Sequence, residues 1–96
     1  MKSIMQDKKV CYFCGNTQGL DEHHVFGGPN RKVAEKYGLK VWLCNDFTRN
    51  RCHRMVHEGE DTKELMELLH REGQKAFESE WGTRDDFMWL FGRNYL

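Results

Sequence analysis

The chain has 96 residues, with 15 Lys and Arg balanced by 15 Asp and Glu. This length predicts a single domain over residues 1–96, whose core is so small that a bound metal would add useful stability. Residues 1–10 lack the apolar region of a signal peptide, and no apolar stretch is long enough to span a membrane. We therefore expect a cytoplasmic protein without a membrane partner, whose four cysteines bind metal rather than form disulfides.

The zero net charge hides a division along the chain. Residues 1–57 contain ten Lys and Arg against five Asp and Glu, and residues 58–96 contain five against ten. A basic half would suit a polyphosphate partner such as DNA, and the acidic half would suit a protein partner. Charges on solvated faces also segregate by chance, so both interpretations stay open.

Three short apolar runs predict strands, over residues 10–13, 20–26 and 40–43. Gly15 follows the first run and permits the tight turn that lets the two thiols of Cys-x2-Cys approach one ion. A helix is predicted over residues 31–37, because Asn30 can cap its start and Gly38 can end it.

The remainder of the chain predicts helices. A polar loop over residues 45–51 leads to a short helix over residues 52–57. Apolar residues recur at helical spacing over residues 62–79, although Gly73 weakens the middle of this helix. Residues 87–91 are too apolar to be exposed. Two capping boxes are predicted, Asp61 with Glu64 and Thr83 with Asp86.

Cys11 and Cys14 have the spacing of one half of a tetrahedral zinc site, whose other half must come from elsewhere in the chain. Cys44 and Cys52 are the available partners, although seven residues separate them where two to four are usual. A shared Zn²⁺ would act as a structural staple. The alternative is that some of these residues are ordinary buried cysteines.

Four histidines need a separate explanation, because one tetrahedral site cannot use eight ligands. His53 and His57 are four residues apart, so a helix would place both on one face within reach of the same ion. His23 and His24 are neighbours on an extended segment, so their side chains point to opposite sides and one ion would normally take only one of them. Three imidazole ligands leave a coordination position open, which is typical of a catalytic metal.

Four motifs follow one another along the chain: Cys-x2-Cys, Glu22-His23-His24-Val25, Leu43-Cys44 and Cys52-His53-x3-His57. In this combination the chain resembles the HNH endonucleases, which have the ββα-metal or His-Me finger fold. With Gly27-Gly28 and Asn30-Arg31-Lys32, it is further similar to small phage and prophage proteins of the HNH-like type associated with recombination or DNA processing. The resemblance covers residues 11–58. It implies an α+β fold with a zinc-stabilised core, to which residues 59–96 add a helical C-terminal extension.

By this resemblance the catalytic ion would be bound by His23, His53 and His57. His24 would act as the general base. The middle asparagine of the family has no counterpart at the usual offset, and Asn45 and Asn50 are the candidates for its supporting role.

The resemblance implies a metal-dependent endonuclease that cleaves or nicks DNA. A neutral imidazole can take the proton of an attacking water near neutral pH. The working ion could be Mg²⁺, Mn²⁺, Ni²⁺ or Zn²⁺. Phosphates would be held, with little choice of sequence, by Arg31, Lys32, Lys36, Arg49, Arg51 and Arg54. The rival hypothesis is a non-catalytic zinc-binding module on the same fold, which binds DNA or a protein.

Overall fold

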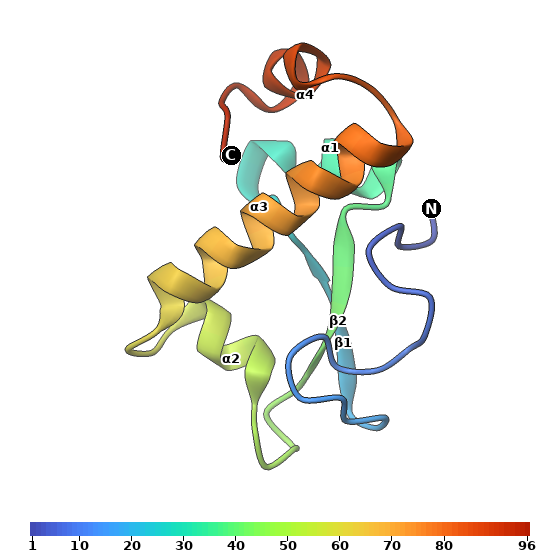
Figure 1. Ribbon diagram of the computed structural model, residues 1–96. Helices are drawn as coiled ribbons and strands as arrows, with labels where there is room; N and C mark the ends of the chain where they lie inside the picture. The colour runs from blue at the N-terminus through green and yellow to red at the C-terminus, as the bar shows by residue number, and fades with distance from the viewer.

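A two-stranded antiparallel sheet of β1 (Leu20–His24) and β2 (Lys40–Cys44) lies at the centre of the computed structural model, which describes residues 1–96 (Figure 1). The four α-helices of this small α+β fold are α1 (Arg31–Tyr37), α2 (Cys52–His57), α3 (Thr62–Glu80) and α4 (Arg84–Phe91). A 3-10 turn, η1 (Gly28–Asn30), precedes α1 in the connection between the strands. None of the helices combines the length and the apolar composition needed to cross a bilayer.

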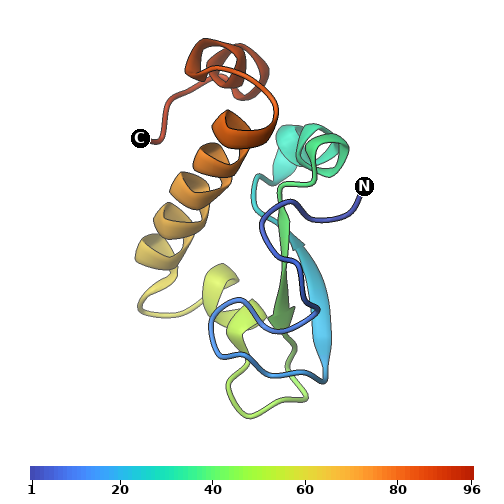
Figure 2. The ribbon, with the colours of Figure 1, turned by 45° about the vertical axis from the view of Figure 1, so that its right-hand side comes forward.

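The sheet separates two groups of side chains, because neighbouring residues of a strand point to opposite faces. Asp21 pairs with Leu43 and His23 with Val41, on the face where Val41 and Leu43 are buried. His24 pairs with Lys40 on the other face. α2 packs against both β2 and α3, and Figure 2 shows it between the strands and the N-terminal end of α3.

The N-terminal segment occupies the free edge of β2. The hydroxyl of Ser3 donates to the carbonyl oxygen of Lys40, and the backbone N–H of Trp42 donates to Gln6 Oε1 at 2.7 Å. The backbone N–H of Tyr12 donates to the carbonyl oxygen of Trp42 at 2.8 Å. These bonds satisfy polar groups of an edge strand that would otherwise be open to pairing with another chain.

The strand predicted over residues 10–13 is wrong, because the chain turns there. The N–H of Cys11 donates to the carbonyl oxygen of Asn16 at 2.8 Å, and the N–H of Gly15 donates to that of Cys11 at 2.9 Å. These local bonds use backbone groups that a strand would need for pairing. Gly15 has a φ of 78°, so its predicted part in a tight turn is confirmed.

The other elements lie close to the prediction. The helices over residues 31–37 and 52–57 are confirmed, with Gly38 at a φ of 73° ending the first. The predicted strand over 20–26 ends earlier, at His24, because the next two residues turn into the core. The predicted strand over 40–43 is longer by one residue, Cys44.

Two of the predicted caps are wrong. Asn30 has a φ of −93° and a ψ of 0°, so its side chain cannot fold back onto the helix, and its Nδ2 donates to the carbonyl oxygen of Phe91 at 3.4 Å. Asp61 has a φ of −100° and a ψ of 10° and makes no cap bond either. Instead the hydroxyl of Thr62 donates to the carbonyl oxygen of Met55 at 2.9 Å, which ties α3 to α2.

The capping box of α4 is confirmed. The N–H of Asp86 donates to Thr83 Oγ1 at 3.1 Å, and the N–H of Thr83 donates to Asp86 Oδ2 at 2.8 Å. The prediction that residues 87–91 are buried holds in part. Phe87 and Phe91 are 0% and 5% exposed, whereas the helix turns Met88 and Trp89 towards solvent.

Phe26 lies at the centre of the aromatic core. Its ring centroid is 4.7 Å from that of Phe91 and 5.5 Å from that of Phe87. Gly73 is the point where α3 crosses this ring, since a Cβ atom there would lie 2.9 Å from Phe26 Cε2 and 3.0 Å from Val25 Cγ1. The glycine that weakens the helix locally is therefore what allows α3 to approach Val25 and Phe26, which directly follow β1.

Gly73→Ala is expected to lower the free energy of unfolding by about 1–2 kcal/mol, because overpacking of a tight core outweighs the gain in helix propensity. Urea denaturation followed by circular dichroism measures this change. Ser79→Ala on the exposed side of α3 is the matched control and should leave stability unchanged or slightly raised. A Gly73→Ala protein as stable as the control would contradict the close approach described here.

Candidate metal centres

The four cysteines form a compact cluster. Their Sγ atoms all lie within 4.8 Å of one another, and no disulfide joins them. The Sγ atoms of Cys14 and Cys44 are 3.8 Å apart. A tetrahedron with Zn–S distances of about 2.3 Å has S···S edges of about 3.8 Å. The cluster is therefore compatible with a structural zinc site built from Cys11, Cys14, Cys44 and Cys52.

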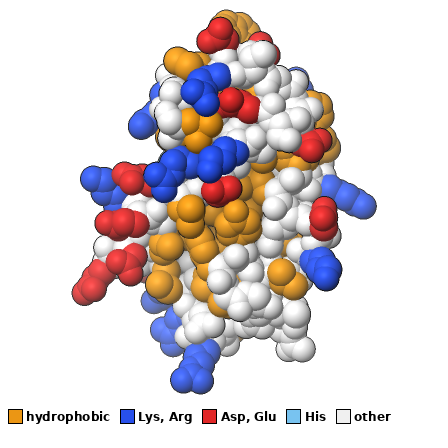
Figure 3. All heavy atoms as spheres, in the orientation of Figure 1, with side chains coloured by type: hydrophobic (Ala, Val, Ile, Leu, Met, Phe, Trp, Pro, Cys, Tyr) orange, Lys and Arg blue, Asp and Glu red, His pale blue; other side chains and the backbone are white.

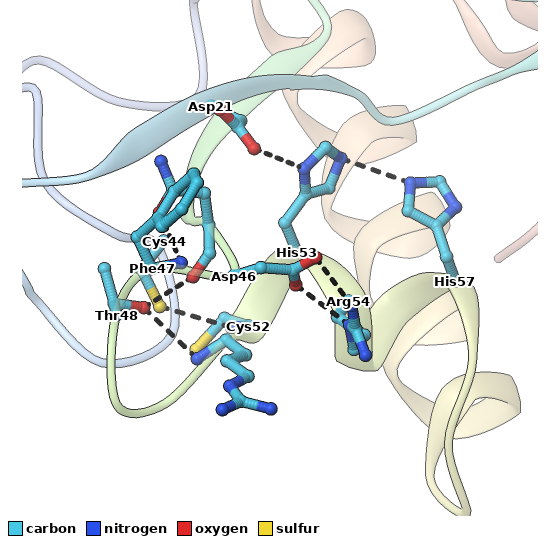
Figure 4. A network of polar contacts seen from close by, with 11 residues as sticks. Asp21, Cys44, Asp46, Phe47, Thr48, Cys52, His53, Arg54 and His57 are labelled. Atoms are coloured by element: carbon cyan, nitrogen blue, oxygen red, sulfur yellow. Dashed lines mark hydrogen bonds and ion pairs between the residues drawn. The ribbon is translucent and has the colours of Figure 1, made fainter.

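The wide spacing between Cys44 and Cys52 has a structural reason. Cys44 is the last residue of β2 and Cys52 is the first residue of α2, so the loop over 45–51 passes outside the cluster. The backbone N–H of Cys52 donates to Cys44 Sγ at 3.2 Å, which brings the start of the helix to the end of the strand (Figure 4). The cluster thus joins the N-terminal turn, the sheet and α2.

The surroundings of the cysteines act on their pKa values in opposite directions. Hydrogen bonds from the side chain of Asn50 and the backbone of Asn16 lower the pKa of Cys14 to about 6. Burial, together with the neighbouring thiols, raises the pKa of Cys52. A Zn²⁺ ion would reverse this second effect, because coordinated thiols are held as thiolates.

The second cluster consists of His23 from β1 and His53 and His57 from α2. One ring nitrogen of each lies within 4.8 Å of the others, and the Nε2 atoms of His53 and His57 are 3.2 Å apart. His23 Nε2 is the one buried side-chain nitrogen or oxygen without a hydrogen-bond partner. Such an unpaired group costs about 1–3 kcal/mol, which a bound ion would recover.

Within the histidine cluster, His23 has the protonation state that a metal ligand needs. Burial, followed by the proximity of His53 and His57, lowers the pKa of His23 to about 3, so its imidazole is neutral at neutral pH. His53 Nδ1 lies 3.0 Å from Asp21 Oδ2, where an N–H at this position would donate to the carboxylate. The other ring nitrogen of His53, Nε2, faces His57 Nε2, as Figure 4 shows. Carboxylates commonly orient metal-binding histidines in this way.

His24 lies on the opposite face of β1. Its Nε2 is 3.0 Å from Glu35 Oε1 of α1, and Glu35 Oε2 is 2.9 Å from Lys40 Nζ. Lys40 first, and then His24, lower the pKa of Glu35 to about 2. Glu22, His24 and Glu35 could also approach one cation. However, the ammonium group of Lys40 already contacts both carboxylates, at 3.2 Å from Glu22 Oε1.

His24 nevertheless lines the same cleft as the histidine cluster. This cleft of about 300 Å³ is lined by His24, the three clustered histidines and Arg31 of α1. Of the two candidates for the middle asparagine of the family, neither bonds to His24. Asn45 Oδ1 accepts from the N–H of Phe47 at 3.0 Å, and Asn50 lies beside Cys14.

The six predicted phosphate-binding residues are distributed over two regions. Arg31, Lys32 and Lys36 belong to α1, where Arg31 borders the cleft. Arg49 and Arg51 are exposed in the loop between β2 and α2. Figure 3 shows Lys and Arg side chains at the lower end, where Figure 1 places this loop, and acidic side chains at the left edge. Arg54 is 2.8 Å from Asp46 Oδ2, so its charge is offset.

Two residues of the site, Asp21 and Glu35, were not among the predicted ones. Asp21 could have been found from the alternation of β1, which places it on the same face as His23. Glu35 carries no such local signal, because its contact with His24 depends on the path of the connection between the strands. No family model, curated protein or solved structure matches this chain.

The cysteine cluster predicts about one tightly bound zinc per chain after mild chelation. Cys14→Ser should lose this zinc and largely unfold, because metal binding supplies folding free energy. His57→Ala is the control and should keep the cysteine-bound zinc and the fold. Elemental analysis and circular dichroism measure both. A well-folded, metal-free Cys14→Ser protein would rule out a structural zinc.

Asp21→Asn is expected to weaken metal binding at the histidine cluster about 10- to 100-fold, since it removes the carboxylate that orients His53. Glu22→Gln is the matched control, because this neighbour lies on the other face and pairs with Lys40. Isothermal titration with Mn²⁺ or Ni²⁺ compares the two variants after the cysteine cluster has been filled with zinc. Equal losses in both would show that Asp21 has no particular role.

Proposed function

We propose that this chain is a metal-dependent nuclease that hydrolyses phosphodiester bonds of DNA, on an HNH-type ββα-metal core. One observation carries the proposal: the buried, unpartnered Nε2 of His23 lies with His53 and His57 in a cleft that also contains a histidine outside their cluster. A structural site has no use for that fourth histidine. A hydrolytic site needs it as a base.

The histidine cluster fits a catalytic ion better than a structural one. Its three protein ligands would be His23, His53 and His57, which leaves coordination positions for water and phosphate. When bound there, a divalent ion such as Mg²⁺, Mn²⁺, Ni²⁺ or Zn²⁺ would stabilise negative charge on the scissile phosphate. The four cysteines would hold a separate structural Zn²⁺.

His24 is the proposed general base. Its Nε2 lies 3.0 Å from Glu35 Oε1, and its Nδ1 makes no hydrogen bond within the chain. In the tautomer that donates from Nε2 to this carboxylate, Nδ1 would carry the lone pair. A neutral imidazole in this tautomer can accept the proton of the attacking water. The water oxygen then bonds to phosphorus while the bond to the leaving oxygen breaks. Arg31, on the wall of the same cleft, would hold the phosphate.

The second candidate function is a zinc-binding module that binds DNA or a protein without cleaving it. The cysteine cluster favours it, because four thiolates form a closed site with no position for substrate. The acidic side chains of α3 and α4 would offer a surface to a protein partner. In this alternative the histidine cluster would hold a second structural zinc, but His24 in the same cleft would have no part in the site, and we therefore favour the nuclease.

The proposal predicts different failures for the two neighbouring histidines. His24→Ala should keep the fold, the metal content and the DNA affinity, while strand cleavage falls by at least about 100-fold, the usual scale for losing a positioned base. His23→Ala should lose both the second metal and the activity, because two imidazoles hold an ion poorly. Plasmid nicking across Mg²⁺, Mn²⁺, Ni²⁺ and Zn²⁺, combined with metal analysis, measures both variants.

If the two variants lost metal and activity to the same extent, the proposal that His23 is a ligand and His24 the base would be contradicted. Undiminished cleavage by rigorously purified His24→Ala would show that another group is the base. DNA binding without cleavage in any metal would favour the zinc-binding module.

A further inference from the structure

Phe47 is the most exposed of the large apolar residues. It is 98% exposed and lies in the loop over 45–51, between β2 and α2. Only Trp89 on α4 approaches this value, at 85%. An exposed ring contributes nothing to the core, and aromatic residues on loops commonly serve in binding.

The loop presents Phe47 on a fixed turn. The N–H of Phe47 donates to Asn45 Oδ1 at 3.0 Å, and the hydroxyl of Thr48 donates to the carbonyl oxygen of Asn45 at 2.7 Å. A Cβ atom at Gly19 would lie 2.7 Å from Thr48 Cγ2, so the loop packs tightly on the chain before β1. The residues that flank the loop, Cys44 and Cys52, both belong to the cysteine cluster. Because the backbone that carries the ring is held in place, ordering the loop would cost little conformational entropy on binding.

Phe47 borders the outer side of the histidine cluster. One open cleft is lined by Phe47 together with Asp21, His53 and His57, and Figure 4 shows these residues around the start of α2. If a nucleic-acid strand placed one phosphate at the histidines, a neighbouring nucleotide would therefore lie beside the ring of Phe47.

The unpaired charges beside Phe47 fit a nucleic-acid strand, because the neighbouring Asp46 is paired with Arg54 at 2.8 Å. Arg49 and Arg51 follow it in the same loop, are exposed and form no ion pair. A fixed aromatic ring beside free cations is the combination that binds single strands, because the cations hold phosphates and the ring stacks on a base. Bases inside a duplex are already stacked and offer no free face to such a ring.

We propose that Phe47 stacks on an unpaired base next to the phosphodiester bond held at the histidine cluster, so that the favoured substrates carry unpaired nucleotides. This inference rests on the proposed nuclease function, and it adds the class of substrate. A protein segment seated on the same ring is the competing occupant, and the binding experiment separates the two.

The test compares three labelled DNA ligands by fluorescence anisotropy, at one salt concentration and without added divalent metal. They are a single strand, the same strand in a full duplex, and that duplex with an unpaired flap. The wild type should bind the single strand and the flap more tightly than the duplex. Phe47→Ala should weaken binding of these two by about 10- to 100-fold and leave duplex binding almost unchanged.

Two further variants complete the comparison. Phe47→Trp should retain wild-type affinity, because an indole ring also stacks. Trp89→Ala removes a comparably exposed aromatic ring on α4 and should bind all three ligands like the wild type. Since both altered side chains lie on the surface, neither the Phe47 nor the Trp89 variant should lose its fold.

The outcomes separate the two proposals. Wild-type affinity of Phe47→Ala for the single strand would overturn the stacking role, and cleavage by the wild type would then leave the nuclease function standing. Loss of single-strand binding in Phe47→Ala without cleavage in any metal would support stacking and overturn the nuclease. A wild type that binds none of the three ligands would overturn both and favour a protein partner.

Discussion

The meeting of four thiols is the constraint on which the rest of the structure depends. β2 ends and α2 begins at a cysteine of this cluster, so α2 cannot move away from the sheet without breaking it. This position brings His53 and His57 of α2 against His23 of β1. The residues of the proposed catalytic site are thus placed by a neighbouring site that takes no part in the reaction. In a chain with so small a core, a metal can supply stability that packing alone would not.

Because side chains alternate along β1, its neighbouring residues lie on opposite faces and contact different helices. Asp21 and His23 face α2, where Asp21 contacts His53 and His23 is a candidate metal ligand. His24 faces α1, where its Nε2 lies 3.0 Å from Glu35 Oε1. Both histidines still border one cleft, so the proposed metal ligand and the proposed base would act on a substrate in the same cleft. A shift of one residue in register would exchange these roles.

The sequence predicted the features that depend on local geometry. The extents of α1 and α2, the convergence of His53 and His57 and the opposite directions of His23 and His24 follow from helix and strand periods. Features that depend on tertiary contacts could not be predicted. The turn at Cys11, the bond between Glu35 and His24 and the crossing of α3 at Gly73 all require knowledge of which segments meet. The HNH resemblance stays a prediction.

A titration with Co²⁺ tests most directly whether the histidine cluster is a metal site separate from the cysteines. Two equivalents should bind, the first with intense thiolate-to-cobalt absorption and the second with weak visible absorption alone. His57→Ala should lose only the second, because the cysteine cluster does not include this residue. Binding of a single equivalent, with a spectrum that His57→Ala leaves unchanged, would contradict the account.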